Sequence, residues 1–285
     1  MNKQKINIGN VEILSLSDGR LSFRPDDFFP DVPLGSWNVY PDSLGEDGCL
    51  VMNMGCFILK SENKTILVDT GLGPYSHNLD TLQESHVSLE SGLLKSAFQS
   101  IALKPEDIDF VAITHLHMDH VGWNFTQEGT GLVPTFPNAR YLIPLADWRL
   151  FKRSASNKRF SYIEEQVIPL EKLGCLELFE SEKEITASIT AIPTPGHTPG
   201  HTSYLIDSDG EMGIVSGDII HVPAQVQEPE WSPRADMKPN LAVKSRMDIL
   251  EKLEHDTGLL ISGHFPQPGF GRLLRLEGKR YWQAL

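Results

Sequence analysis

The stretch THLHMDHVG, residues 114–122, decides how this sequence is interpreted. It follows an apolar run, residues 110–113, that predicts a strand, so four side chains able to bind a metal fall in the tight turn after it. Buried polar side chains need partners, and packing alone does not explain four of them within six residues. The stretch has no cysteine. Its nitrogen and oxygen donors suit a catalytic site for zinc, or alternatively iron, manganese or cobalt.

One metal ion cannot easily take all four donors of this stretch. His115 and His117 lie on the same side of an extended segment, so both can reach one ion. Asp119 and His120 are offset from them and can serve a neighbouring ion. The remaining donors must therefore come from other parts of the chain.

Three later turns each follow an apolar run and each carry one further donor. A glycine stands directly before that donor in every turn, which lets the backbone turn sharply and aim the side chain into a cleft. The three turns are residues 193–201 with His197, residues 216–218 with Asp218, and residues 262–264 with His264.

Together these motifs resemble those of the metallo-β-lactamase superfamily. The matching residues occur in the family's order from residue 68 to residue 264, so the resemblance covers most of the chain. It implies an α/β (α+β) fold, a four-layer αββα sandwich with the metal ions at one edge. The matching motifs are Val68-Asp69-Thr70-Gly71, His115-x-His117-x-Asp119-His120, Gly196-His197, Gly217-Asp218 and Gly263-His264.

The resemblance also implies a role for each candidate ligand. Asp218 would bridge two ions, and Asp69 would be a buried carboxylate that orients the metal loop. His201 is expected to be structural, because the ligand set is complete without it. Three other histidines have no neighbouring donors and are expected to lie toward solvent: His77, His86 and His255. The first ion would have the ligands His115, His117 and His197, and the second would have Asp119, His120 and His264.

The rest of the sequence predicts one α/β domain over residues 1–285. Two stretches with apolar residues every three or four positions, 89–101 and 243–253, predict helices. Two long Pro-containing segments with aromatic side chains, 24–40 and 221–240, are expected to be loops that wall a substrate pocket or pin themselves to the body. Strands are predicted at residues 11–16, 56–59, 66–68, 110–113, 141–143, 189–192, 203–206, 213–215 and 259–261.

Composition limits the partners. With 38 acidic and 25 basic residues, the formal net charge is −13, so we expect a small-molecule substrate, no nucleic acid and no membrane. An odd number of cysteines and the lack of a signal-peptide pattern favour a cytoplasmic location, and the sequence leaves room for a homodimer. The basic residues Lys152, Arg153, Lys158 and Arg159 are expected to form a solvated face, and the cysteines Cys49, Cys56 and Cys175 to be buried.

The donor set predicts hydrolysis. Two divalent ions, most simply Zn²⁺, would share a bridging hydroxide as nucleophile, and Asp119 would shuttle a proton. Residues 115–124, residues 134–139 and the Pro-rich stretch after Asp218 resemble the lactonase and organophosphate-hydrolase branch. A lactone, an ester or a phosphotriester is therefore the expected substrate. Asp218 argues against β-lactams, because metallo-β-lactamases proper generally lack this residue.

His221 departs from the pattern of that branch. Quorum-quenching lactonases commonly have a tyrosine three residues after the bridging aspartate, where this chain has His221. His221 either donates a hydrogen bond near the leaving group or is a loop histidine that faces solvent. The alternatives to a lactonase are a glyoxalase II-like thioesterase and a mono-iron oxidoreductase similar to persulfide dioxygenase. The thioesterases commonly continue with two glycines, whereas here Trp123 follows Gly122.

Overall fold

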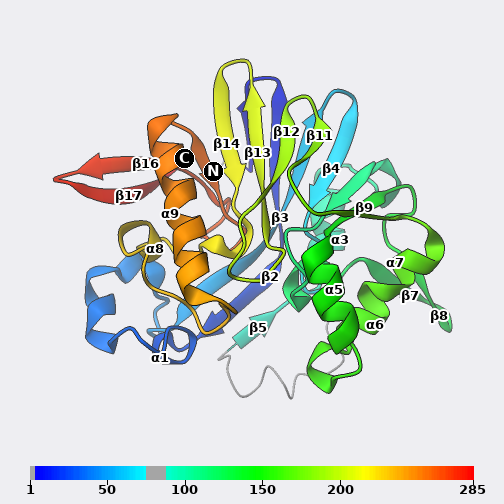
Figure 1. Cartoon of the computed structure of the whole chain (residues 1–285), viewed down its shortest axis with the longest axis horizontal. Coiled ribbons are helices and arrows are strands. Elements are labelled where there is room, and N and C mark those ends of the chain that lie inside the picture. Colours follow the sequence, from blue (N-terminus) through cyan, green and yellow to red (C-terminus); the bar gives the residue numbers. More distant parts are fainter. Residues whose placement is uncertain (1–3, 75–87) are drawn as a thin grey trace.

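Two β-sheets form the centre of the computed structural model, which describes residues 4–74 and 88–285 (Figure 1). The first sheet has the order β1-β2-β3-β4-β6-β9-β10, and β5 pairs with β2. Its strands are β1 Lys5–Ile8, β2 Val11–Phe23, β3 Leu50–Ser61, β4 Lys64–Val68, β5 Ser88–Glu90, β6 Phe110–Ala112, β9 Arg140–Pro144 and β10 Leu176–Phe179.

The second sheet follows the order of the chain from β11 to β17. Only β14 and β15 are parallel neighbours in it, and the other pairs are antiparallel. A small hairpin, β7 Phe125–Glu128 with β8 Gly131–Pro134, stands apart. The strands are β11 Lys183–Thr186, β12 Ile189–Pro193, β13 Thr202–Ser208, β14 Glu211–Val215, β15 Leu259–Ile261, β16 Phe270–Leu276 and β17 Lys279–Ala284.

Helices cover the outer face of each sheet, and α5 and α9 lie on opposite sides of the pair in Figure 1. The helices are α1 Pro25–Phe28, α3 Leu94–Ser100, α4 Met118–Val121, α5 Leu145–Ser154, α6 Tyr162–Gln166, α7 Ile168–Leu173, α8 Ala224–Gln227 and α9 Pro239–His255. Short 3-10 helices are η1 Leu34–Val39, η2 Pro41–Ser43, η3 Pro105–Asp107, η4 Lys158–Phe160 and η5 Gly217–Ile219.

Three apolar cores hold these layers together. One core lies between the sheets, where Phe57 and Ile66 of the first sheet pack with Tyr204 of the second. Another joins the first sheet to its helices, and a third joins the second sheet to α9 through residues such as Ile214 and Leu250. Burial of apolar area on both faces of each sheet is the main force that favours this arrangement. The predicted four-layer αββα architecture is therefore confirmed.

All nine predicted strands are present, although β6 ends before Ile113. The first predicted helix begins too early, because Leu89 lies in β5 and α3 starts at Leu94. For the second helix the predicted apolar face is partly wrong. Met247 is exposed, and the face buried by α9 contains Ala242, Ser245, Arg246, Ile249, Leu250 and Leu253.

The two segments expected to be loops contain short helices and pack on each other. Trp37 from the first segment lies 4.8 Å from Trp231 of the second, measured between ring centroids. The Tyr40 hydroxyl donates a hydrogen bond of 2.7 Å to Glu228, and Phe29 contacts Trp37. The aromatic side chains thus pin the segments to each other and to the body, as one of the two interpretations expected.

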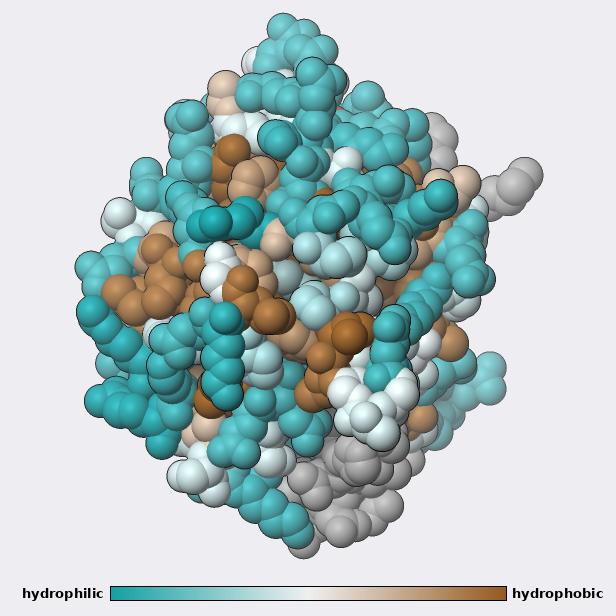
Figure 2. Space-filling model, turned by 90° about the vertical axis from the view of Figure 1, so that its right-hand side faces the viewer, coloured by the Kyte–Doolittle hydropathy of each residue, from teal (hydrophilic) through white to brown (hydrophobic). Residues whose placement is uncertain are grey.

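The structure tests the predictions for four basic residues and three cysteines. Lys152, Arg153, Lys158 and Arg159 are all exposed. The face of the molecule drawn in Figure 2 is mostly hydrophilic, with smaller hydrophobic patches. Lys152 pairs with Glu171 at 2.6 Å. Cys49 and Cys56 are buried, but Cys175 is only partly buried, because it lies at the start of the outer strand β10. Within the described ranges, no helix has the length and apolarity to span a membrane.

Candidate metal centre

The predicted donors all follow the carboxyl-terminal ends of strands. In the first sheet, Val68 of β4 pairs in parallel with Ala112 of β6, so the turns that begin with Asp69 and Ile113 lie side by side. In the second sheet, Val215 of β14 pairs with Ile261 of β15 in the same way. The turns carrying Asp218 and His264 are therefore neighbours, and the turn after β12 brings in His197.

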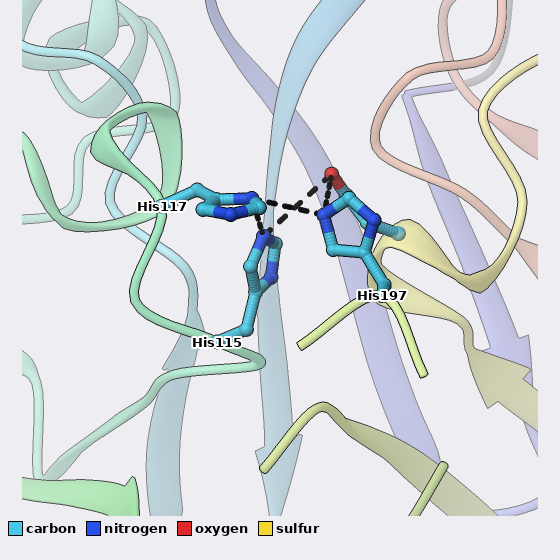
Figure 3. A group of neighbouring side chains, drawn as sticks. His115, His117 and His197 are labelled. Carbon is cyan, nitrogen blue, oxygen red and sulfur yellow. Dashed lines mark hydrogen bonds and ion pairs between the residues drawn. The ribbon is translucent and has the colours of Figure 1, made fainter. Parts of the chain in front are cut away.

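A first group of donors consists of His115, His117, His197 and Asp218. The three imidazole rings point toward one another (Figure 3). His117 Nδ1 lies 2.9 Å from the Nε2 atoms of both His115 and His197. Asp218 Oδ2 lies 3.4 Å from His197 Nε2 and 3.7 Å from His115 Nε2. Ligand atoms around a tetrahedral zinc are about 3.3 Å apart, given bonds of about 2.0–2.1 Å.

A second group consists of Asp119, His120 and His264. Asp119 Oδ2 lies 3.7 Å from the Nε2 atoms of both histidines. Asp218 also reaches this group, because its Oδ1 lies 3.3 Å from His120 Nε2 and its Oδ2 lies 3.1 Å from His264 Nε2. A cavity of about 10 Å³ touches the three residues and Asp218. That is roughly the room of one water molecule. Asp218 is thus the carboxylate that both groups share.

Hydrogen bonds fix which nitrogen of each ring faces the centre. His120 Nδ1 donates to Asp69 Oδ2 at 2.7 Å, and Asp69 also accepts from the Thr114 backbone and hydroxyl, both at 2.8 Å. His264 Nδ1 donates to the Asn53 carbonyl at 2.8 Å. Both rings therefore present Nε2 to the donor groups, which is the orientation that such hydrogen bonds impose on metal-binding histidines. Asp69 orients the loop as predicted.

The charges in the site suit a cation. Burial lowers the pKa of His115, His117 and His197 well below the ordinary value for imidazole, so these rings are neutral. Burial alone would raise the pKa of Asp218, but the neighbouring histidines hold it well below its usual range. An ionised carboxylate and neutral imidazoles are the protonation states in which these side chains bind metals.

The pKa values of the second group depend on its carboxylates. For His264, burial lowers the pKa, but Asp218 outweighs burial and raises it to about 9. The pKa of His120 is raised well above its usual value, because Asp218, Asp69 and Asp119 together outweigh the effect of burial. A divalent cation at this group would compete with those protons, because metal binding requires the neutral ring.

Two glycines allow the turns to form. Gly217 has φ of +55°, and a Cβ atom there would lie 2.6 Å from His201 Nε2. Gly196 has φ of +139°, and a Cβ atom would lie 2.2 Å from the Ala242 backbone nitrogen. Any other residue at either position would therefore be strained and would also push the turn away from its neighbour. Gly263 has no positive φ, and its lack of a side chain only lets the turn approach β3 closely, because a Cβ atom there would lie 3.0 Å from the Gly55 carbonyl oxygen.

His201 and Asp147 support the turns without joining the donor groups. His201 Nε2 accepts a hydrogen bond from the Asp218 backbone N–H at 2.8 Å, and its Nδ1 lies 2.9 Å from the Thr194 hydroxyl. Both nitrogens are occupied, in agreement with the predicted structural role. Asp147 accepts from Leu116 N, at 3.2 Å, and from the turn that carries His197, through Gly200 N at 2.6 Å. Burial raises the pKa of Asp147 to about 6, against these hydrogen bonds.

His221 does not face solvent. Its exposed fraction is 2%, and its Nε2 lies 3.3 Å from Asp218 Oδ2. The ring stacks on His264 with centroids 5.4 Å apart and contacts Phe28 at 5.4 Å. Of the two interpretations of the sequence, the solvent-facing one is therefore wrong, and His221 lies against the donor groups. His255 is exposed as expected, whereas His77 and His86 lie outside the described residues.

Sequence reasoning missed several buried charged residues around the site. Asp236 accepts from His197 Nδ1 at 2.9 Å, and Arg246 of α9 pairs with Asp236. Asp18 accepts hydrogen bonds from Gly73 N and Trp123 Nε1, and so ties the turn after β4 to the segment after α4. A signal existed for Arg246, because it occurs at helical spacing among apolar residues of the buried face of α9. No local pattern marks Asp236 or Asp18.

Comparisons with known proteins agree with this fold and donor set. The sequence profile described as "Metallo-beta-lactamase superfamily" matches residues 56–264. Since that match covers most of the chain, the protein belongs to the metallo-beta-lactamase superfamily, and the predicted family is confirmed.

Among curated relatives, the chain is 26% identical over 233 residues to an N-acyl homoserine lactonase of Bacillus cereus. The match covers 78% of this chain and 85% of the relative. Two solved structures share the fold over 99% of this chain and 96% of theirs. The hydrolase AbOPH has a TM-score of 0.83 at 24% identity. The dizinc quorum-quenching lactonase AidC, in complex with the product N-hexnoyl-L-homoserine, has a TM-score of 0.79 at 23% identity.

The superfamily implies divalent metal ions, and the residues present fit them. Imidazole and carboxylate donors suit zinc and similar ions. His120 Nε2 is buried and, within the described part of the chain, makes no hydrogen bond of good geometry, although Asp218 Oδ1 lies 3.3 Å away; a buried polar atom normally has such a bond. A cation at the second donor group would be the missing partner of this nitrogen.

Proposed function

We propose that this protein is a binuclear metal-dependent hydrolase that opens lactone or ester bonds. The observation that carries the proposal is the arrangement of seven donors in two groups that Asp218 connects, because its Oδ2 lies 3.4 Å from His197 Nε2 in the first group and 3.1 Å from His264 Nε2 in the second. His115, His117 and His197 would hold one ion, Asp119, His120 and His264 the other, and Asp218 would bridge them. Zinc is the first choice by donor type, and iron, manganese or cobalt are alternatives. Two ions in such a site supply a nucleophile from water at neutral pH and polarise the scissile carbonyl.

The side chains around the ions would manage protons and the leaving group. The Asp119 side chain is 16% exposed and lies at the edge of the second group, so it can exchange protons with substrate and solvent. His221 is held between Phe28 and His264 with Nε2 directed to Asp218. From that position we expect His221 to donate a hydrogen bond to the leaving oxygen as negative charge develops there.

The neighbourhood of His221 favours a neutral substrate. Phe28 lies against His221 and belongs to an apolar cluster that includes Leu72, Met118 and Trp231. Small-molecule sites are mostly apolar with a few placed polar groups, so this apolar neighbourhood supports a neutral substrate. Relatives named N-acyl homoserine lactonases support a lactone or another ester rather than a highly charged substrate.

The test is a panel of substrates given to the zinc-loaded protein: γ-lactones, aryl esters, thioesters, phosphotriesters and β-lactams. We expect lactones or aryl esters to have the highest kcat/KM. A clear preference for thioesters would support the glyoxalase II-like alternative instead. One iron per chain, with persulfide oxidation and no hydrolysis, would support the dioxygenase-like one. We also retain a cytoplasmic location and a homodimer as proposals, which fractionation and sedimentation would test.

A further inference from the structure

A fully buried arginine lies behind the candidate metal centre. Arg246 projects from α9, and neither it nor Asp236 has an exposed side chain. The Arg246 Nη2 atom lies 3.2 Å from Asp236 Oδ2. Removing two charges from water costs several kcal/mol per ion, and a buried pair is often no more stable than apolar residues of similar volume. The pair therefore calls for an explanation other than general stability.

The second oxygen of Asp236 binds a candidate ligand. His197 Nδ1 donates to Asp236 Oδ1 at 2.9 Å, which leaves His197 Nε2 directed to the first donor group. The backbone beside Asp236 also pairs with the same turn. Met237 N donates to the His197 carbonyl at 3.0 Å, and Lys238 N donates to the Gly196 carbonyl at 2.9 Å. Asp236 is thus held against the His197 turn by side chain and main chain together.

The same guanidinium reaches the turn that carries Asp218. Arg246 Nε donates to the carbonyl of Ile219, the residue after Asp218, and Nη1 donates to the carbonyl of Pro229. One side chain therefore contacts the η5 turn, the segment between α8 and α9, and the carboxylate that orients His197. The planar fork of arginine can serve three such acceptors at once, whereas lysine offers only a compact charge.

We propose that Asp236 and Arg246 are positioning residues that hold His197 in place for the metal ion of the first donor group. The inference rests on the proposed role of His197 as a ligand. Hydrogen-bond partners of metal-binding histidines typically change metal affinity by about 10–100-fold when they are removed. Asp236 and Arg246 should act through affinity at one ion and leave the other unchanged, because His120 and His264 are oriented by Asp69 and Asn53.

The experiment measures stepwise zinc affinity by competition with a chromogenic chelator, together with the visible absorption of the Co²⁺-loaded protein. The variants are Asp236→Asn, which keeps the size of the side chain, and Arg246→Lys, which keeps its charge. Asp248→Asn is the matched control. Asp248 is an exposed carboxylate of α9, the helix that carries Arg246, and among the described residues it pairs only with Lys244. Far-UV circular dichroism and thermal melting of each variant report the fold.

We expect Asp236→Asn to bind one zinc about 10–100-fold more weakly, to bind the other with wild-type affinity, and to change the Co²⁺ spectrum. Arg246→Lys should lower the affinity for the same ion by a smaller factor, and Asp248→Asn should have the zinc affinities of the wild type. Wild-type affinity for both ions in Asp236→Asn would overturn the inference. An equal loss at both ions with a large fall in melting temperature would also overturn it, in favour of a purely structural pair.

The outcome for the proposed function is read separately. If the wild-type protein holds only one ion, the binuclear proposal fails. The inference then still requires that ion to bind about 10–100-fold more weakly in Asp236→Asn than in Asp248→Asn.

Discussion

His120 and His197 belong to different donor groups and are oriented in the same way by different parts of the chain. Each donates its Nδ1 proton to a buried carboxylate, His120 to Asp69 at 2.7 Å and His197 to Asp236 at 2.9 Å. Asp69 receives its other hydrogen bonds from uncharged donors of Thr114. Asp236 faces a buried guanidinium instead.

Asp69 is a local support, because it lies next to His120 through strand pairing, whereas Asp236 is a remote support of His197, because it comes from a distant connection. Asp69 and His120 follow the adjacent strands β4 and β6, so the pairing of the first sheet brings them together. Asp236 lies in the connection before α9, and this connection contacts the His197 turn while α9 packs on the second sheet. One donor group is therefore built by strand pairing and the other also by the outer layer of the fold.

The largest effect is expected for Asp218, the carboxylate that joins the two groups. Asp218→Ala should lose metal from at least one group and lower kcat/KM on the order of 10³-fold or more, since losing a ligand should exceed the 10–100-fold effect of losing a ligand's partner. Metal analysis and hydrolysis rates check this. Asp207→Ala, which removes an exposed carboxylate of β13, is the control. Wild-type metal content and rate in Asp218→Ala would show that Asp218 does not bridge two metal ions.

His221→Ala tests a residue that contacts both groups and that forms a further group of possible ligands with Asp218 and His264. We expect kcat on the best lactone or aryl ester to fall by roughly 10²–10³, as for loss of a transition-state hydrogen-bond donor, while both metals stay bound. His255→Ala is matched in chemistry but lies on the surface. An unchanged kcat would show that His221 is a bystander, and loss of metal would show that it supports the site rather than the reaction.

Asp69→Asn and Asp236→Asn, measured side by side, compare the carboxylates that orient His120 and His197. Asp236→Asn should weaken the binding of the first ion and Asp69→Asn chiefly that of the second, each by about 10–100-fold. Asp69→Asn should also have a smaller effect on the first ion, because the Thr114 hydroxyl that contacts Asp69 lies 3.0 Å from His115 Nδ1. Stepwise zinc titration distinguishes the two ions. If both single variants chiefly weaken the same ion, the division into a local and a remote support is wrong.

The smallest effect is expected at the basic surface. Lys152→Ala removes an exposed ion pair with Glu171 and should lower the free energy of unfolding by about 0.2–1 kcal/mol, with unchanged zinc content and kcat. Urea denaturation measures the first quantity. A marked rise in KM for the best substrate would mean that this patch binds substrate and is not merely solvated.

The sequence allowed the fold and the donor set to be predicted because their signals are local. Short apolar runs mark the strands, and the donors stand at fixed distances after them, as with His115, Asp218 and His264. The positions of Asp69 and His201 followed from the same motifs, and the structure agrees with both.

The supports of the first donor group could not be predicted in this way. Asp236 lies in a Pro-rich connection with no periodic pattern, and its partners His197 and Arg246 come from two other elements. The predicted apolar stripe of α9 was right at Leu250 and Leu253 but wrong at Met247, which is exposed, whereas Arg246 occupies the buried face. A charged residue on such a face becomes understandable only when its tertiary partner is known.

The metal content of the protein tests the account most directly. Seven donors in two groups that Asp218 connects suit two ions and exceed what one zinc takes. Protein purified without chelator and analysed by inductively coupled plasma mass spectrometry should approach two divalent ions per chain. A firm value of one ion per chain, with full hydrolytic activity, would contradict the binuclear centre.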